Sequence, residues 1–95
     1  MRIFGYVVGF QWDDGNRDKI LGKHGLELNE CEEVFQDVER QFFPDVRHSA
    51  KEERYVVVGK TRSGKILFVA FTVRGSLFRV ISARPINRRE IKLYE

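Results

Sequence analysis

Three neighbouring stretches in the second half of the chain consist mostly of β-branched and aromatic residues and are separated by short polar segments, a pattern typical of β-strands. Polar linkers at residues 62–65 and 74–76 separate the stretches and are short enough for hairpins. The middle stretch is apolar on both faces between residues 66 and 71, as in a central strand. The pattern predicts an antiparallel meander whose strands span residues 54–61, 66–73 and 77–84.

The N-terminal third predicts a strand followed by a helix. Residues 3–11 are rich in Val, Phe and Tyr, which favours a strand. Asp13 or Asp14 can cap a helix that runs to about His24, because short acidic side chains accept hydrogen bonds from the first free amides of a helix. Gly25 follows where a left-handed C-terminal cap is expected.

A second helix is predicted from Asn29, which can serve as its cap with Glu32 three residues later. It ends near Asp37, and its apolar stripe consists of Leu28, Cys31, Val34 and Phe35. Residues 39–52 have no sustained period and indicate a connection, with room for a short edge strand at residues 41–43.

The chain ends in a predicted helix. Pro85 stops the last strand, and Asn87 with Glu90 predicts a helix start that leads to about Tyr94. The order is therefore βααβββα, an α+β fold in which an antiparallel sheet carries its helices on one face. The other face would be left to solvent or a ligand. The length of 95 residues predicts a single domain over residues 1–95.

Composition indicates an ordinary globular protein, since 42% of the residues are hydrophobic. No apolar run approaches the roughly 20 residues of a membrane span, and the start of the chain shows neither a basic leader nor a cleavage site. We therefore expect a cytoplasmic protein without membrane contact. Cys31 has no second cysteine to pair with and no basic residue within a helical turn, so we expect a reduced, part-buried and unreactive thiol.

Charge divides the chain into an acidic and a basic part. Residues 1–59 hold 8 Lys and Arg against 12 Asp and Glu, whereas residues 60–95 hold 9 against 2. The net charges of the two parts are −4 and +7. Neutralising phosphates drives sequence-independent binding of nucleic acid, so the basic part is the better candidate for meeting RNA. A solvated basic surface is the plainer explanation.

The densest basic stretch is residues 79–90, with four arginines. Strict alternation predicts Arg79 and Arg84 on opposite faces of the last strand. Arginine is rarely buried without a partner and is well shaped to grip a phosphate. Position alone leaves two explanations open, ion pairing within the fold and contact with an RNA backbone. The surplus of positive charge favours the phosphate.

The sequence holds no recognisable metal or cofactor motif. His24 and His48 are 24 residues apart with Cys31 between them, which is not the close spacing of a zinc site. Gly64-Lys65 lacks the upstream glycine and the following Ser or Thr of a phosphate-binding loop, and no serine lies in a nucleophile elbow. We expect neither a metal nor a cofactor.

A metal-independent ribonuclease needs a base for the 2′-OH, a cation for the charged phosphorane and an acid for the leaving oxygen. Lys23 and His24 fit such roles, but they equally fit a helix C-terminus, where cations interact well with the dipole. Arg88 and Arg89 lie early in the last helix, where positive charge is unfavourable, which suggests a phosphate or an acidic partner. The candidates are Arg54, Arg79 and Arg84 as cations, Glu53, His24 and His48 as proton carriers, and Lys23 for either role.

Taken in order, motifs along the chain resemble the BrnT toxin family. The resemblance covers about residues 10 to 95, and the order and spacing of the motifs are more specific than any one of them. Ile20 departs from the family, which often has Asn there, and Lys51 stands where a Gly is common. The motifs are Phe10-Gln11-Trp12-Asp13, Lys23-His24-Gly25, Val34-Phe35, Asp45-x-Arg47-His48-Ser49, Glu53-Arg54-Tyr55, Val58-Gly59, Arg79-Val80-Ile81-Ser82-Ala83-Arg84, Arg88-Arg89-Glu90 and Tyr94.

The resemblance implies a RelE-like fold and a ribonuclease toxin of a bacterial type II toxin–antitoxin system that inhibits translation without a metal. A BrnA-like antitoxin with a ribbon-helix-helix domain would neutralise it, and the complex would repress its own promoter, so that DNA is met only through the antitoxin. The implied catalytic residues are Lys23, His24, Glu53, Arg54, Arg79 and Arg84, and the implied RNA-binding residues are Arg74, Arg88 and Arg89.

Which residue acts as base and which as acid stays open. The alternative hypothesis is a non-catalytic basic module that binds the antitoxin and acts as a co-repressor.

Overall fold

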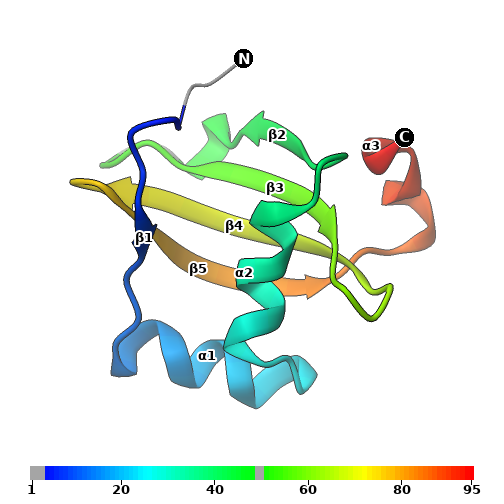
Figure 1. Ribbon diagram of the computed structural model, residues 1–95, viewed down its shortest axis with the longest axis horizontal. Coiled ribbons are helices and arrows are strands. Elements are labelled where there is room, and N and C mark those ends of the chain that lie inside the picture. The colour runs from blue at the N-terminus through cyan, green and yellow to red at the C-terminus, as the bar shows by residue number, and fades with distance from the viewer. Residues whose placement is uncertain (1–3, 49–50) are drawn as a thin grey trace.

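The computed structural model describes residues 4–48 and 51–95, and it describes Lys23, His24 and His48 by their backbone alone. A five-stranded sheet forms the centre of the molecule (Figure 1). The elements are β1 (Gly9–Phe10), α1 (Asp14–His24), α2 (Leu28–Gln36), β2 (Gln41–Pro44), β3 (Tyr55–Lys60), β4 (Ile66–Arg74), β5 (Leu77–Pro85) and α3 (Ile91–Tyr94), with 3₁₀-helices at Val46–His48 and Arg88–Glu90.

The strands lie in the order β1-β5-β4-β3-β2, which confirms the predicted meander and the central position of β4. β2 pairs with β3 over its full length, so the sequence order gains a strand and becomes βααββββα. β1 runs parallel to β5. The prediction of a wholly antiparallel sheet is therefore wrong at this edge, because the chain between β1 and β5, which contains α1, α2 and the strands β2, β3 and β4, returns so that the two strands run in the same direction.

The strand predicted over residues 3–11 is reduced to β1, and residues 1–3 lie outside the described part of the chain. A turn begins at Phe4, whose carbonyl accepts a hydrogen bond from the amide of Val7. The Phe4 ring lies 5.1 Å from the rings of both Phe42 and Tyr55. Phe4, one of the apolar residues that indicated a longer strand, thus packs against the core from a turn.

One face of the sheet carries the hydrophobic core and lies under α1 and α2 (Figure 1). Val57, Val69 and Phe71 are all 0% exposed on this covered face and cluster with Val34 and Phe35 of α2. Buried residues that alternate with these, such as Val56, belong to the opposite face, which we call the open face.

The helix caps follow the sequence in two of three cases. Asp13 caps α1, Gly25 ends it in a left-handed conformation at φ 65°, and the Asn87 and Glu90 side chains form the predicted capping box before α3. The cap of α2 is Glu27, with Glu30 folded back onto its amide, rather than Asn29 with Glu32. Glu32 is engaged elsewhere, because its carboxylate accepts a hydrogen bond from the Trp12 indole at 2.7 Å.

A β-bulge in β5 changes which residues share a face. Phe71 pairs with Val80 and Ala70 pairs with Ser82, so Ile81 has no partner across the ladder. The prediction that Arg79 and Arg84 lie on opposite faces is therefore wrong. The extra residue resets the alternation between them and puts both side chains on the open face.

The predicted one-sided arrangement of helices holds for α1 and α2 but not for α3. Leu93 of α3 lines a cavity together with Val56 and Phe68, both of which point away from the covered face. The Tyr94 hydroxyl donates a hydrogen bond to Asp37, the residue that ends α2. This bond connects α3 to a helix that packs on the covered face. In the part of the chain that is described, no helix has the length and apolarity needed to cross a membrane.

Candidate functional site

Side chains on the open face form rows that run across the strands, and three consecutive rows bear on a site. The first row, next to the Arg74–Leu77 pair at the β4–β5 hairpin, is polar; the second is apolar or small; and the third combines apolar and polar groups with an arginine. Two residues of strand, about 6.6 Å, separate neighbouring rows. In this order the rows hold Thr72 and Arg79, with Arg54 just before β3; Phe43, Val56, Ala70 and Ser82; and Gln41, Val58, Phe68 and Arg84.

Arg79 is held by the start of α1. Its guanidinium donates to both carboxylate oxygens of Asp13, at 2.7 and 3.1 Å, and to the side-chain oxygen of Gln11 at 3.2 Å. The hydrogen bond from Arg79 is the main cause that lowers the pKa of Asp13 below its ordinary value. The Arg79 side chain is 15% exposed, so a phosphate could reach only part of it without displacing Asp13.

Arg84 is held in the same way at the other end of β5. Its guanidinium donates to both oxygens of Glu90 at 2.7 Å and lies 4.2 Å above the ring centre of Phe68. This hydrogen bonding is the main cause that lowers the pKa of Glu90 to about 2. Internal ion pairing, the alternative that the charge count disfavoured, thus describes both strand arginines in this structure.

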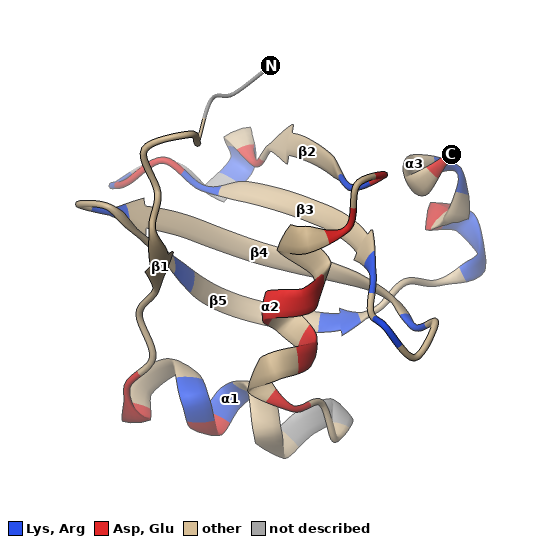
Figure 2. Cartoon of the chain, viewed as in Figure 1, with Lys and Arg blue, Asp and Glu red and all other residues tan. Residues whose placement is uncertain are grey.

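A basic cluster forms at the hairpin end of the open face around Glu52. Arg74 donates to both oxygens of this carboxylate, at 3.1 and 3.3 Å. That hydrogen bonding, and the weaker fields of Arg54 and Arg79, lower the pKa of Glu52. Arg74 thus pairs with Glu52, and Arg54 and Arg79 lie close enough for their charges to act on the same carboxylate. Figure 2 shows basic residues at both ends of the sheet, whereas α2 is acidic.

Glu53 stands beside this cluster and is exposed. Its carboxylate accepts a hydrogen bond of 2.6 Å from the Tyr55 hydroxyl, and this bond is the main cause that raises the pKa of Tyr55. Its backbone carbonyl accepts a hydrogen bond from the buried Thr72 hydroxyl. Glu53 is thus positioned through both its main chain and its side chain, and its carboxylate lies beside Tyr55, a residue of the covered face.

The remaining predicted residues either lie apart from this cluster or have side chains outside the described part of the chain. Lys23 and His24 form the last turn of α1, and His48 ends a 3₁₀-helix, but their side chains are outside the described part of the chain. Arg88 and Arg89 are exposed on the 3₁₀-helix that follows Arg84. Arg54, Arg74 and Arg79 are therefore brought together near Glu52, whereas the Glu53 carboxylate lies with Tyr55 on the side of the covered face. Arg84, Arg88 and Arg89 form a second basic group.

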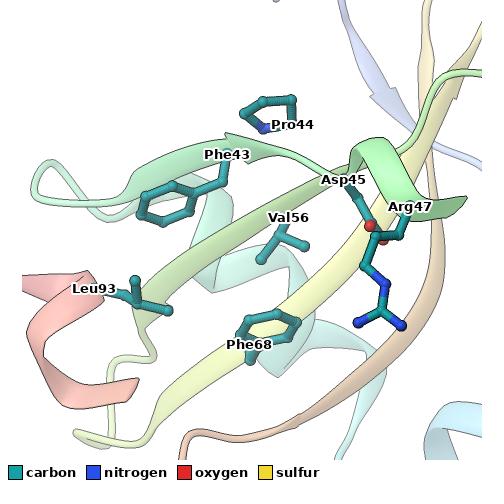
Figure 3. A pocket seen from close by; sticks show the side chains of 7 residues that line it. All are labelled: Phe43, Pro44, Asp45, Arg47, Val56, Phe68 and Leu93. Atoms are coloured by element: carbon teal, nitrogen blue, oxygen red, sulfur yellow. The ribbon is translucent and has the colours of Figure 1, made fainter. Parts of the chain in front are cut away.

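A cavity of about 330 Å³ lies on the open face between these two basic groups. Figure 3 shows Val56 on its floor, with Phe43 and Phe68 on opposite sides. Its other lining residues are Pro44, Asp45, Arg47 and Leu93. Large aromatic residues that stay partly exposed around a concave, mostly apolar space are typical of a binding site.

Metal binding and the chemistry of Cys31 are two further possibilities that the structure addresses. Within the described residues, no set of three or more His, Cys, Asp or Glu side chains is arranged to hold a metal ion. Cys31 is fully buried in the core, and burial is the main cause that raises the pKa of its thiol to about 12. The prediction of an unreactive thiol agrees with this environment, since the thiolate is the reactive form.

Sequence reasoning missed the groups that hold the arginines. Asn16 is 3% exposed, and its side-chain nitrogen donates to the carbonyls of Gln11 and Val80 at 3.0 Å. These bonds attach the start of α1 to β5 next to Arg79. The spacing of Asp13 and Asn16 was a usable signal, because an amide three residues after a cap can complete a capping box.

Comparison with known proteins gives a family and a similar structure. A family model described as the ribonuclease toxin BrnT of type II toxin–antitoxin systems matches residues 12–90. The 1.1 Å crystal structure of the Brucella abortus ribonuclease toxin BrnT is 26% identical to this chain, with a TM-score of 0.64. The match covers 86% of this chain and 100% of that one. No curated protein sequence gives a significant match.

Proposed function

The chain belongs to the BrnT family of ribonuclease toxins of type II toxin–antitoxin systems, and on this premise we propose that it cleaves RNA on the open face of its sheet. The observation that carries the proposal is the bulge in β5, which gives Arg79 and Arg84 the same exposed side of the sheet. Their ladder partners Thr72 and Phe68 are four residues apart, so the two positions are about 13 Å apart along the strand. A single RNA strand could contact both.

The proposed reaction needs no metal ion. The ribose 2′-oxygen attacks the adjacent phosphorus while a base takes its proton, the bond to the 5′-oxygen breaks, and an acid returns a proton to that oxygen. Arg54, Arg74 and Arg79 supply positive charge for the phosphorane at the hairpin end of the face. Glu53, Lys23 and His24 are the candidate proton carriers, and Glu53 would have to turn its carboxylate from Tyr55 toward the open face.

Arg84, Arg88 and Arg89 are proposed to bind the RNA backbone or the antitoxin. The antitoxin itself is proposed to be a BrnA-like ribbon-helix-helix protein that brings the toxin to DNA. Inhibition of translation in the cytoplasm follows if the substrate is messenger RNA.

The test is cleavage of RNA by the purified chain in EDTA, with paired variants. Arg79→Gln removes the cation, whereas Asp13→Asn removes its partner and keeps a good helix cap. We expect Arg79→Gln to lower the cleavage rate at least 100-fold and Asp13→Asn to retain it. Arg40→Gln, which changes the net charge equally beside Phe42 on the covered face, is the control and should cleave normally. Wild-type protein that leaves RNA intact would overturn the proposal.

One observation favours the alternative, a non-catalytic module that binds an acidic antitoxin segment. Arg79 and Arg84 already hold carboxylates in bidentate geometry, which is how such a segment would be bound. Expression in bacteria without an antitoxin separates the two functions. Arrested growth that Arg79→Gln relieves supports the nuclease, and normal growth supports the binding module.

A further inference from the structure

The cavity on the open face has the size and shape to hold one flat ring. Phe43 on β2 and Phe68 on β4 are separated by β3, so their strands are about 9.6 Å apart, and the two residues belong to neighbouring rows about 6.6 Å apart along the strands. Bases stack about 3.4 Å apart, and a base between two aromatic rings therefore needs about 7 Å. Val56 forms an apolar floor, and Ala70, the ladder partner of Val56, adds only a methyl group on the side toward β5. The space between the two phenylalanines is thus wide enough for a base.

The charges around the cavity suit a ring that belongs to a polyanion. The Arg84 guanidinium lies over the Phe68 ring, so a phosphate at Arg84 would place its attached nucleoside near the cavity. Arg47 is the second cation on the rim, and in Figure 3 its guanidinium extends toward the strand that carries Phe68. Aromatic walls next to guanidinium groups are how proteins commonly hold single-stranded nucleic acid.

We propose that this cavity is a nucleobase-binding site for single-stranded RNA, with Phe43 and Phe68 as stacking platforms and Arg84 and Arg47 at the phosphates. The proposal rests on the proposed function and adds a base-binding position beside the cleavage cluster. Stacking is tolerant of base identity, so the cavity contributes affinity and positions the strand over the open face. Arg47 on the rim can also donate to the edge of the base.

The test compares two labelled, non-cleavable 2′-O-methyl oligonucleotides, one with bases and one abasic, by fluorescence anisotropy. Both carry the same phosphates, so the ratio of their dissociation constants measures binding of bases alone. Base stacking on an aromatic side chain predicts a ratio of about 5 to 150 for the wild-type protein. Phe68→Leu, which conserves most of the apolar volume, should lower the ratio to near one.

Two more variants keep the result interpretable. Val56→Phe fills the floor of the cavity and should abolish the base preference in the same way, which gives a second measurement if Phe68→Leu folds poorly. Ile91→Ala is the control, because Ile91 lies on α3, is 43% exposed and does not line the cavity. It should keep the wild-type ratio.

The outcomes separate this site from the nuclease proposal. A base preference that Phe68→Leu removes supports the site even if the protein cuts no RNA. A wild-type ratio near one, or an unchanged ratio in Phe68→Leu, overturns it even if cleavage is normal. Failure to bind either oligonucleotide overturns it as well. Equal binding of both, together with loss of antitoxin neutralisation in Phe68→Leu, would assign the cavity to an antitoxin side chain instead.

Discussion

The two faces of the sheet are built from alternate residues of the same strands, yet they are organised in opposite ways. On the covered face, Phe71 packs edge-on against Phe35 and Phe78, with ring centres 5.0 and 5.2 Å apart. On the open face, Phe68 has a guanidinium above it and a cavity beside it. Burial on one side supplies stability, which leaves the other side able to keep charged and aromatic groups exposed.

The largest expected effect is the loss of an aromatic ring from the covered face. Phe71→Ala removes a side chain that is 0% exposed, and such cavities typically cost about 3–5 kcal/mol. Phe68 lies three residues away on the same strand and on the opposite face. Phe68→Ala should cost less than half as much, because the Phe68 ring is already partly exposed. Urea unfolding of both variants measures the difference. Equal losses would mean that the open face belongs to the core.

The second effect concerns how closely the covered face approaches α2. A Cβ atom at Gly59 would lie 2.8 Å from both the carbonyl oxygen and a side-chain methyl of Val34, so the helix must shift. Gly59→Ala should therefore lower the free energy of unfolding by about 1–3 kcal/mol.

Gly22→Ala is the matched control for that change. Nothing lies within 4 Å of a Cβ at Gly22, and alanine is the better helix former. Thermal unfolding should show a small gain in stability of up to about 1 kcal/mol. A Gly59→Ala protein as stable as this control would show that α2 is not fixed against the sheet.

The elements predictable from sequence were those with local causes. The Asp13 cap, the left-handed Gly25 and the hairpins need only neighbouring residues, and the sequence predicted them. The bulge at Ile81 and the parallel pairing of β1 depend on partners far along the chain, so alternation alone placed Arg79 wrongly. The family resemblance and composition singled out the arginines as candidates, and their roles stay predictions, whereas their carboxylate partners become evident only in three dimensions.

The faces should also respond to opposite extremes of pH. The pKa of Glu90 on the open face is lowered to about 2 from an ordinary value of 4.5, so its stabilisation is complete above pH 4.5 and is lost as the pH falls toward 2. The pKa of Cys31 under the covered face is raised to about 12 from 9.0, so its contribution is complete below pH 9 and is lost as the pH rises toward 12.

Unfolding free energies measured across both ranges test this contrast. Glu90→Gln should reduce the dependence between pH 2 and 4.5, where Asp13 and Glu52 with their lowered pKa values also contribute, and leave the alkaline range unchanged. Cys31→Ala should reduce the dependence in the alkaline range only, where Tyr94, whose pKa is also raised to about 12, keeps its own contribution. If either variant changed the pH dependence of the unfolding free energy in both the acid and the alkaline range, the separation of the two faces would be contradicted.

The smallest expected effect on stability, and the sharpest on function, comes from the Arg84 and Glu90 pair. Arg84→Gln and Glu90→Gln each remove the same ion pair, and glutamine at position 90 can still complete the capping box. Because the Arg84 side chain is 38% exposed, each change should cost about 1 kcal/mol or less.

Their effects on RNA should have opposite signs, because only Arg84→Gln removes a cation from the open face. Arg84→Gln should weaken RNA binding. It should also lower the slope of log affinity against log salt by about 0.7, the value for one phosphate contact to a single strand. Glu90→Gln removes the carboxylate that competes with phosphate, so RNA should bind more tightly. Equal RNA affinities in the two variants would mean that Arg84 serves the fold alone, and the open face would then bind RNA only at its hairpin end.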